Sequence, residues 1–160
     1  PGSALVRGAQ RAREVAADVE RSKRFWCDGL GFTELFDHIF TGDWPTLFNA
    51  RTDRLRSVFL GDPNTPDSGI VELVQFARGR EERDVISVTA DVPSPDEPAF
   101  GFFLLSLECD VDATLAGLAE LGFADGVRRI EMPAPGGKTV AMAVITAPDG
   151  VRVELIGPPE

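Results

Sequence analysis

One pattern occurs twice in this 160-residue chain and constrains its fold more than any other feature. Residues 66–73 read PDSGIVEL and residues 148–155 read PDGVRVEL. In both copies a Pro-Asp turn with a glycine leads into a β-branched run. A glutamate follows the proline at the same spacing in each, Glu72 in the first copy and Glu154 in the second. Such a repeat predicts two similar modules, and the chain is long enough to form both.

A second pair of matching segments precedes the first pair in the same order. Residues 18–32 open with Asp-Val-Glu and residues 110–123 open with Asp-Val-Asp, and both end with Leu-Gly-Phe. An aspartate before an apolar helical stripe and a glycine after it are typical of a helix N-cap and C-cap. Each segment is therefore predicted to be a helix that leads into an extended run.

Apolar and β-branched runs predict the strands around each helix. The strands after the helices are expected at residues 32–40, 55–60, 70–76, 127–132, 139–146 and 151–156. One further strand is expected before each helix, within residues 6–17 and within residues 102–109. On local propensity residues 9–17 favour a helix, but the repeat requires a strand there. The sequence thus predicts an α+β fold of two βαβββ modules, residues 1–78 and 100–160, joined by linker residues 79–99.

Composition limits the partners of the chain. The 26 acidic residues outnumber the 16 basic ones, and this excess repels phosphate backbones, so a nucleic-acid partner is not expected. No apolar stretch approaches the ~20 residues that cross a bilayer, and no signal-peptide pattern opens the sequence. Cys27 and Cys109 form neither a disulfide framework nor a zinc-site spacing. We expect a cytoplasmic chain with reduced thiols and no membrane partner.

The motifs DVERS, FW and LGF within residues 18–32, followed by APDGVRVEL at residues 147–155, resemble the vicinal-oxygen-chelate superfamily, which includes glyoxalases, bleomycin-resistance proteins and dioxygenases. The resemblance covers about residues 6–156. It implies two curled mixed sheets around a small-molecule cavity, and a homodimer. In metal-using members the first strand of each module gives a His or Gln and the last strand of a module gives a Glu. Glu72 and Glu154 match the last-strand positions.

The first-strand positions depart from the pattern of the superfamily. Counting back from Asp18 places Arg11 where a His is usual, with Gln10 beside it, and counting back from Asp110 places Phe103 or Leu104 there. The chain has one histidine, which excludes a two-His iron site and with it a ring-cleaving dioxygenase. No cofactor is expected. The alternative is a divalent ion (Mg²⁺, Mn²⁺, Ni²⁺ or Zn²⁺) that is held by three residues, Glu154, Glu72 and Gln10.

Three residues are candidates for catalysis. Glu72 and Glu154 would lie on the floor of the cavity, where a carboxylate can serve as general base or acid. His38 is expected to share a strand face with Phe36 and Phe40, which favours an acid/base role. The alternatives are solvated or arginine-paired carboxylates and a structural histidine.

Other residues are candidates for substrate binding. The arginines would form an anion clamp, and the aromatic residues would line or cover the cavity for a flat ligand. They are Arg11, Arg54, Arg56, Trp44 in the expected loop 41–45, and Phe103. The alternative is that the arginines pair with surface acids and the phenylalanine belongs to the strand core.

Two functions remain open on the sequence alone. The first is a glyoxalase-like enzyme of isomerase, epimerase, lyase or cyclase type that transfers a proton on an oxygenated, flat small molecule with a degenerate metal site. The second is a metal-free protein that binds a drug or metabolite without chemistry. Retention of both Glu72 and Glu154 favours the enzyme.

Overall fold

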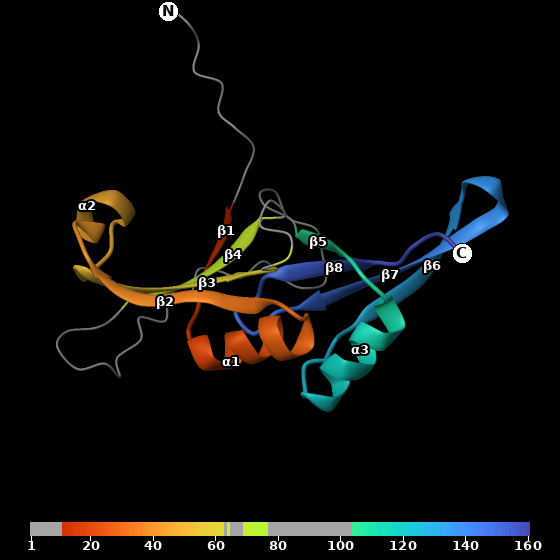
Figure 1. The fold of residues 1–160 in the computed structure, drawn as a ribbon, viewed down its shortest axis with the longest axis horizontal. Coiled ribbons are helices and arrows are strands. Elements are labelled where there is room, and N and C mark those ends of the chain that lie inside the picture. Colours follow the sequence, from red (N-terminus) through yellow and green to blue (C-terminus); the bar gives the residue numbers. More distant parts are fainter. Residues whose placement is uncertain (1–10, 63, 65–68, 77–103) are drawn as a thin grey trace, which may run out of the picture. The chain divides into compact units, whose positions relative to one another are not determined.

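The computed structural model describes residues 11–62, 64, 69–76 and 104–160 (Figure 1), without the side chain of residue 11. It contains two four-stranded sheets, here called sheet 1 and sheet 2. Sheet 1 has the order β1-β4-β3-β2, with β1 (Arg11–Val15), β2 (Thr33–Thr41), β3 (Arg54–Gly61) and β4 (Ile70–Phe76). Sheet 2 has the order β5-β8-β7-β6, with β5 (Leu105–Glu108), β6 (Arg128–Ala134), β7 (Lys138–Thr146) and β8 (Arg152–Ile156).

Short helices connect these strands. α1 (Val19–Lys23) continues as a π-helix (Arg24–Gly29), α2 (Trp44–Phe48) follows β2, and α3 (Val111–Glu120) follows β5. A 3₁₀ turn (Pro135–Gly137) joins β6 to β7. The predicted N-caps of α1 and α3 are confirmed, because the side chains of Asp18 and Asp110 accept hydrogen bonds from the backbone NH groups of Arg21 and Ala113.

The element order confirms the predicted α+β class and the two βαβββ repeats. In each sheet the first strand runs parallel to the last one and the other pairs are antiparallel, so both sheets are mixed. Residues 11–15 form a strand despite their helical composition, because β1 pairs with β4 from Arg11–Ile70 to Val15–Val74. The backbone hydrogen bonds of this pairing outweigh the weak local preference for helix.

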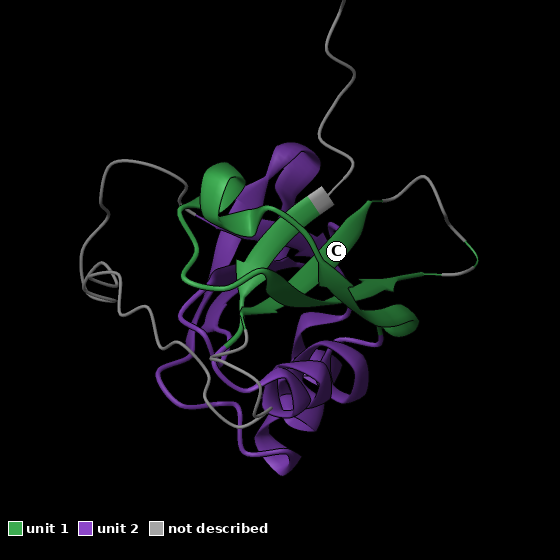
Figure 2. Ribbon diagram, turned by 90° about the vertical axis from the view of Figure 1, so that its left-hand side faces the viewer, with its two compact units in different colours: residues 1–16, 32–85 green, residues 17–31, 86–160 purple. Residues whose placement is uncertain are grey.

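The chain separates into two compact units (Figure 2). The first contains sheet 1 and α2, and the second contains sheet 2, α3 and residues 17–31. In the second unit the ring of Phe25 meets that of Phe123 at 5.5 Å, and Phe25 and Trp26 are fully buried. The predicted linker, residues 79–99, lies outside the described residues, and the predicted module boundaries stay a prediction.

Asp149 connects residues 17–31 to sheet 2. Its Oδ1 accepts a hydrogen bond from the backbone NH of Ala17 at 2.8 Å, and its Oδ2 accepts one from the hydroxyl of the buried Ser22. Asp149 belongs to the second copy of the Pro-Asp-Gly turn, so the repeated motif anchors the helical segment as well as starting β8. Within the described part of the chain, no helix is long and apolar enough to span a membrane.

Candidate functional site

The cross-strand register gathers polar side chains on one face of sheet 1. Arg13 of β1 is paired with Glu72 of β4, which lies opposite Phe59 of β3. Ser57 of β3 lies opposite His38 of β2. Residues that face each other across paired strands project from the same side of a sheet. These four polar residues therefore extend across all four strands, and we call the side that carries them the site face.

Glu72 is the fixed centre of this arrangement. It is 2% exposed, its Oε2 accepts a hydrogen bond from Nε of Arg13 at 2.9 Å, and the same oxygen forms an ion pair with Nη2 of Arg13, also at 2.9 Å. Its Oε1 accepts a hydrogen bond from the hydroxyl of Ser57. Burial of a carboxylate is costly unless it is paired and hydrogen-bonded, and here both oxygens have partners. The side chain is consequently held in one position.

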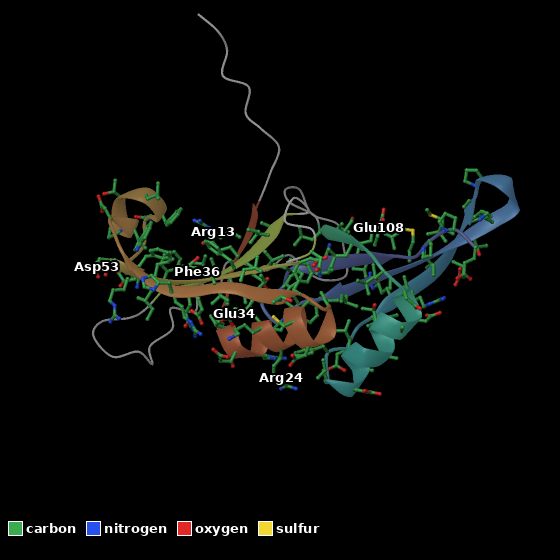
Figure 3. The ribbon with its side chains drawn as sticks, viewed as in Figure 1. Arg13, Arg24, Glu34, Phe36, Asp53 and Glu108 are labelled. Atoms are coloured by element: carbon green, nitrogen blue, oxygen red, sulfur yellow. The ribbon has the colours of Figure 1, made fainter. Side chains whose placement is uncertain are left out.

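Arg13 is more accessible than its partner. Figure 3 labels Arg13 on β1 of sheet 1. Its side chain is 41% exposed, and its guanidinium lies over the ring of Phe48 at 5.3 Å. Phe48 stacks on Trp44 with ring centroids 5.8 Å apart and meets Phe76 edge-on at 6.3 Å. The site face thus offers a guanidinium beside a pair of stacked aromatic rings.

The helix that carries Trp44 and Phe48 was not expected, because residues 41–45 were predicted to be a loop. The side chain of Asp43 accepts a hydrogen bond from the backbone NH of Thr46, and Pro45 lies in the first turn. Both features favour the start of a helix. A sequence signal was therefore present in Asp-Trp-Pro.

His38 lies among aromatic rings on the site face. Its ring is 5.8 Å from that of Phe36 and 5.0 Å from that of Phe40, and Phe36 in turn is 5.4 Å from Phe59. His38 is exposed, as are Phe36 and Phe40, at 41% and 37%. The predicted common face of these three residues is confirmed, while the acid/base role of His38 stays a prediction.

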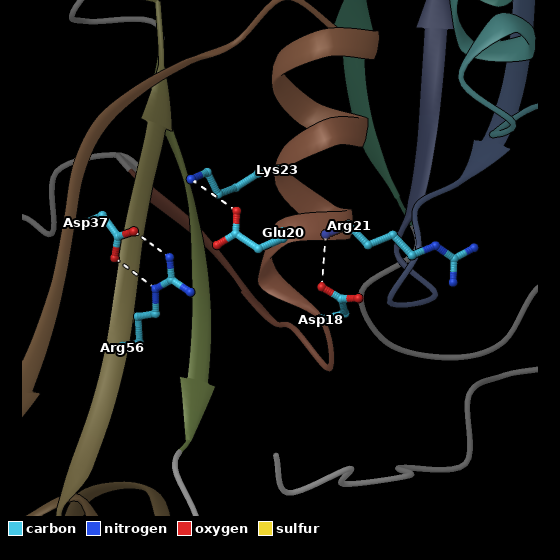
Figure 4. Close-up of polar contacts among 6 residues, drawn as sticks. All are labelled: Asp18, Glu20, Arg21, Lys23, Asp37 and Arg56. Carbon is cyan, nitrogen blue, oxygen red and sulfur yellow. Dashed lines mark hydrogen bonds and ion pairs between the residues drawn. The ribbon is translucent and has the colours of Figure 1, made fainter. Parts of the chain in front are cut away.

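Two of the predicted anion-binding arginines lie on the opposite side of sheet 1. Arg54 and Arg56 alternate with Ser57 along β3, so they project away from the site face. Arg56 binds Asp37 through Nε at 2.9 Å and Nη2 at 2.6 Å (Figure 4). The structure thus separates these arginines from Glu72 and His38. Gln10, Phe103 and the side chain of Arg11 lie outside the described residues.

Sheet 2 carries the second predicted glutamate in a more open setting. Glu154 of β8 is paired with Ser106 of β5, whose hydroxyl donates to Oε2 at 2.5 Å. Ser106 is exposed and Glu154 is partly exposed. Val144 and Arg128 continue this row across β7 and β6. Hydrogen bonds to Asp112 and Glu131 raise the pKa of Arg129, which is next to Arg128 but projects from the other side.

The register shows which first-strand residues pair with the two glutamates. Arg13 lies opposite Glu72 and Ser106 lies opposite Glu154, whereas Arg11 pairs with Ile70. The expected first-strand ligand positions, Arg11 in the first module and Phe103 or Leu104 in the second, stay a prediction. Ser57 and Ser106 were missed, since neither belongs to a recognisable motif.

The residues opposite the two glutamates do not fit a divalent metal. Arg13 is itself a cation, and both oxygens of Glu72 are already engaged with Arg13 and Ser57. A serine hydroxyl is a poor substitute for the imidazole or amide expected at the position of Ser106. In the described residues, no three His, Cys, Asp or Glu side chains are grouped as a metal site would require.

Comparison with known proteins matches the chain over most of its length. The model of the Glyoxalase/Bleomycin resistance protein/Dioxygenase superfamily matches residues 14–155. A lactoylglutathione lyase-like protein of Aspergillus terreus, terB, is 33% identical over 150 residues, which cover 90% of this chain and 72% of that protein.

Solved structures show the same fold at lower identity. A glyoxalase family protein from Bacillus cereus has a TM-score of 0.65 and 15% identity, with 97% of this chain and 95% of that chain covered. The trypanothione-dependent glyoxalase I of Leishmania major has a TM-score of 0.55 and 20% identity, with 95% and 87% covered.

Proposed function

Because the chain belongs to the Glyoxalase/Bleomycin resistance protein/Dioxygenase superfamily, we propose that it catalyses proton transfer on a small, flat, oxygenated molecule bound to the site face. One observation carries the proposal: an exposed histidine, His38, shares an aromatic face with a fixed guanidinium, that of Arg13. The relative in Aspergillus terreus is described as lactoylglutathione lyase-like, which supports chemistry of this general kind.

The aromatic residues support a flat ligand. The rings of Phe36 and Phe40 contact His38, and Phe59 contacts Phe36. Phe48 lies beside Arg13 and stacks on Trp44. Aromatic rings stack on planar conjugated molecules and exclude water from them. The strands of His38 and Arg13 are the two edges of sheet 1, three strand spacings of about 4.8 Å apart. A fused-ring ligand is long enough to reach toward both residues.

The proposed reaction begins at a carbon next to a carbonyl group. His38 removes a proton from that carbon, the C–H bond breaks, and its electron pair moves to the carbonyl oxygen to form an enolate. Return of the proton to the same or an adjacent carbon completes an epimerisation or isomerisation. Loss of a leaving group from the adjacent carbon instead completes a lyase reaction. Both outcomes require a positive group near the enolate oxygen.

The two predicted glutamates receive different roles in this proposal. Glu72 is a positioning residue, because Arg13 and Ser57 occupy its oxygens and it is almost fully buried. Glu154 is partly exposed and accepts one hydrogen bond from Ser106, so it remains a candidate base on sheet 2.

Hydrogen exchange with solvent tests the proposal without a known substrate. A panel of flat aromatic ketones and hydroxyquinones is incubated with the chain in D₂O, and loss of the acidic C–H signal is followed by NMR. We expect His38→Asn to slow exchange by about a hundredfold or more while binding persists. Glu120→Gln, at the exposed end of α3, is the matched control and should exchange at the original rate. Full exchange in His38→Asn would contradict the proposed role.

A second function is supported by the engagement of Glu72. Because Arg13 and Ser57 occupy the carboxylate of Glu72, this group is not available as a general base or acid. Its loss as a catalytic group favours a protein that binds a metabolite or drug without turnover. Saturable binding of a panel member with no exchange of any of its protons would favour this function over the enzyme.

We also propose that the chain forms a homodimer. Strand β6 is an edge of sheet 2, and its residues Ile130 and Met132 are 57% and 46% exposed. An exposed edge strand with large apolar side chains is a surface that a second copy can cover. A cytoplasmic location stays a prediction from the sequence.

A further inference from the structure

We infer that the guanidinium of Arg13 binds an oxyanion of the ligand beside Glu72, the last-strand glutamate that matches a metal-ligand position of the superfamily. The inference deepens the proposed function and rests on it for the position of the ligand on the site face. It requires no turnover, so binding alone tests it. The ligand class is a planar aromatic or conjugated molecule that carries a carboxylate, enolate or phenolate oxygen.

The first support is that the guanidinium is held in a fixed orientation. Nε of Arg13 donates to Oε2 of Glu72, Nη2 forms an ion pair with the same oxygen, and Glu72 is itself fixed by Ser57. The Cζ atom of Arg13 lies over the ring of Phe48, 5.3 Å from the ring centroid. The contacts with Glu72 and Phe48 together limit where the remaining N–H groups point. A donor that is already oriented loses little entropy when a ligand arrives.

The second support is that part of the guanidinium remains available. Arg13 is 41% exposed, and among the residues that the structure describes Nη1 has no hydrogen-bond partner. A guanidinium has five N–H donors, and Glu72 engages only one edge. The outer edge can therefore donate to a ligand oxygen while the ion pair with Glu72 stays intact.

The third support is the chemistry next to the free edge. Planar oxyanions match the fork of a guanidinium, and charge-assisted hydrogen bonds to it are among the strongest in proteins. Phe48 and Trp44 offer stacked rings directly beside Arg13. A ligand whose oxyanion is attached to a ring can contact both. The chain as a whole carries a net charge of −10, which repels anions. Recognition of an anionic ligand must therefore come from a local cation such as Arg13.

The position of Arg13 disfavours a divalent ion at Glu72. The register places it opposite Glu72, the last-strand glutamate that matches the metal-ligand position of relatives. A divalent ion at Glu72 would have to displace the guanidinium and would then be repelled by it. A guanidinium supplies positive charge and directional donors to an oxyanion, which replaces the electrostatic part of what a metal ion contributes.

Equilibrium binding of 2-naphthoate tests the inference, with quenching of tryptophan fluorescence as the readout. The uncharged analogue 2-naphthamide is titrated in parallel. We expect the carboxylate to bind about tenfold or more tightly than the amide. Arg13→Gln should remove this preference, and Arg13→Lys should retain part of it because lysine keeps the charge without the planar fork. Trp44→Phe should lose most of the quenching if the ligand lies on the stack.

Arg24→Gln is the matched control. Arg24 also lies over a phenylalanine ring, that of Phe123 at 5.8 Å, but it is on the π-helix of the second unit. Its loss should leave the preference for 2-naphthoate unchanged. Equal binding of 2-naphthoate and 2-naphthamide by the unaltered chain would overturn the inference. This comparison uses the unaltered chain alone, so it does not require that any variant folds.

Metal titration provides the opposing outcome. A saturable rise in melting temperature of the unaltered chain with Mn²⁺, Ni²⁺ or Zn²⁺, abolished in Glu72→Gln, would place an ion where we place the oxyanion and would also overturn the inference. The proposed function fails in a different way: 2-naphthoate would bind through Arg13, yet no compound would exchange a proton in D₂O.

Discussion

Arg13 and Glu72 form an ion pair between the first and last strands of sheet 1, with the carboxylate 3% exposed and the guanidinium side chain 41% exposed. The pair is therefore asymmetric: its anion belongs to the interior of the unit, and its cation belongs to the surface. Ser57 satisfies the second carboxylate oxygen from β3. The buried carboxylate of Glu72 holds the side chain of Arg13 in place, and the proposed site depends on this contact.

Glu72→Gln should lower the free energy of unfolding by about 2 kcal/mol, because a neutral amide replaces the charged acceptor of two buried or half-buried donors. The partial exposure of Arg13 keeps the loss below that of a fully buried pair. Urea denaturation measures the change. Glu154→Gln is the matched control at the equivalent position of sheet 2, where the partner Ser106 is exposed. Its expected cost is below about 1 kcal/mol. Equal losses in the two variants would contradict the asymmetry of the two sites.

Asp149→Ala should destabilise the second unit by about 1–3 kcal/mol, because it leaves the buried hydroxyl of Ser22 and the NH of Ala17 without their acceptor. Asp149→Asn keeps an acceptor oxygen and should lose less. Hydrogen exchange at residues 17–31, read by mass spectrometry, should increase in the alanine variant before global unfolding. If hydrogen-exchange protection of residues 17–31 and the stability of the chain both stayed unchanged, the contacts of Asp149 would not contribute to stability.

Ile130→Asp tests the proposed homodimer. A charge on the exposed edge strand β6 disfavours burial against a second copy, so the variant should sediment as a monomer at concentrations at which the unaltered chain is a dimer. Glu131→Gln, the next residue on the same strand, projects from the other side and serves as the control. A monomeric unaltered chain at all concentrations would refute the dimer outright.

Much of the fold could be predicted because the repeat carries information that local propensity lacks. Residues 11–15 look helical one by one, and only the second module indicates that a strand belongs there. The alternation along the last strands similarly predicted that Glu72 and Glu154 project away from their buried neighbours. Confirmation comes from Leu73 and Leu155, which are fully buried.

The site was predicted less well because its geometry depends on register. Counting back from Asp18 could not show that Arg13 is the residue paired with Glu72, because that pairing depends on how β1 is aligned along β4. The alternation of side chains along β3 placed Arg54 and Arg56 on the opposite face from Ser57, which no composition argument could determine. Association of residues 17–31 with sheet 2 depends on long-range contacts of Asp149 that are invisible in the local sequence.

Two glycines give opposite predictions for one substitution. A Cβ at Gly29 would lie 2.5 Å from Cδ2 of Leu118, and Leu118 is fully buried and cannot move aside freely. Gly29→Ala should therefore destabilise the chain by about 1–3 kcal/mol through overpacking. Gly117 lies inside α3, and a Cβ there would meet nothing within 4 Å. Gly117→Ala should stabilise by about 0.5–1 kcal/mol, because alanine has the higher helix propensity and restricts the unfolded chain. Thermal and urea unfolding of both variants measures the difference, and a gain in stability for Gly29→Ala would mean that the π-helix does not pack on α3 as described.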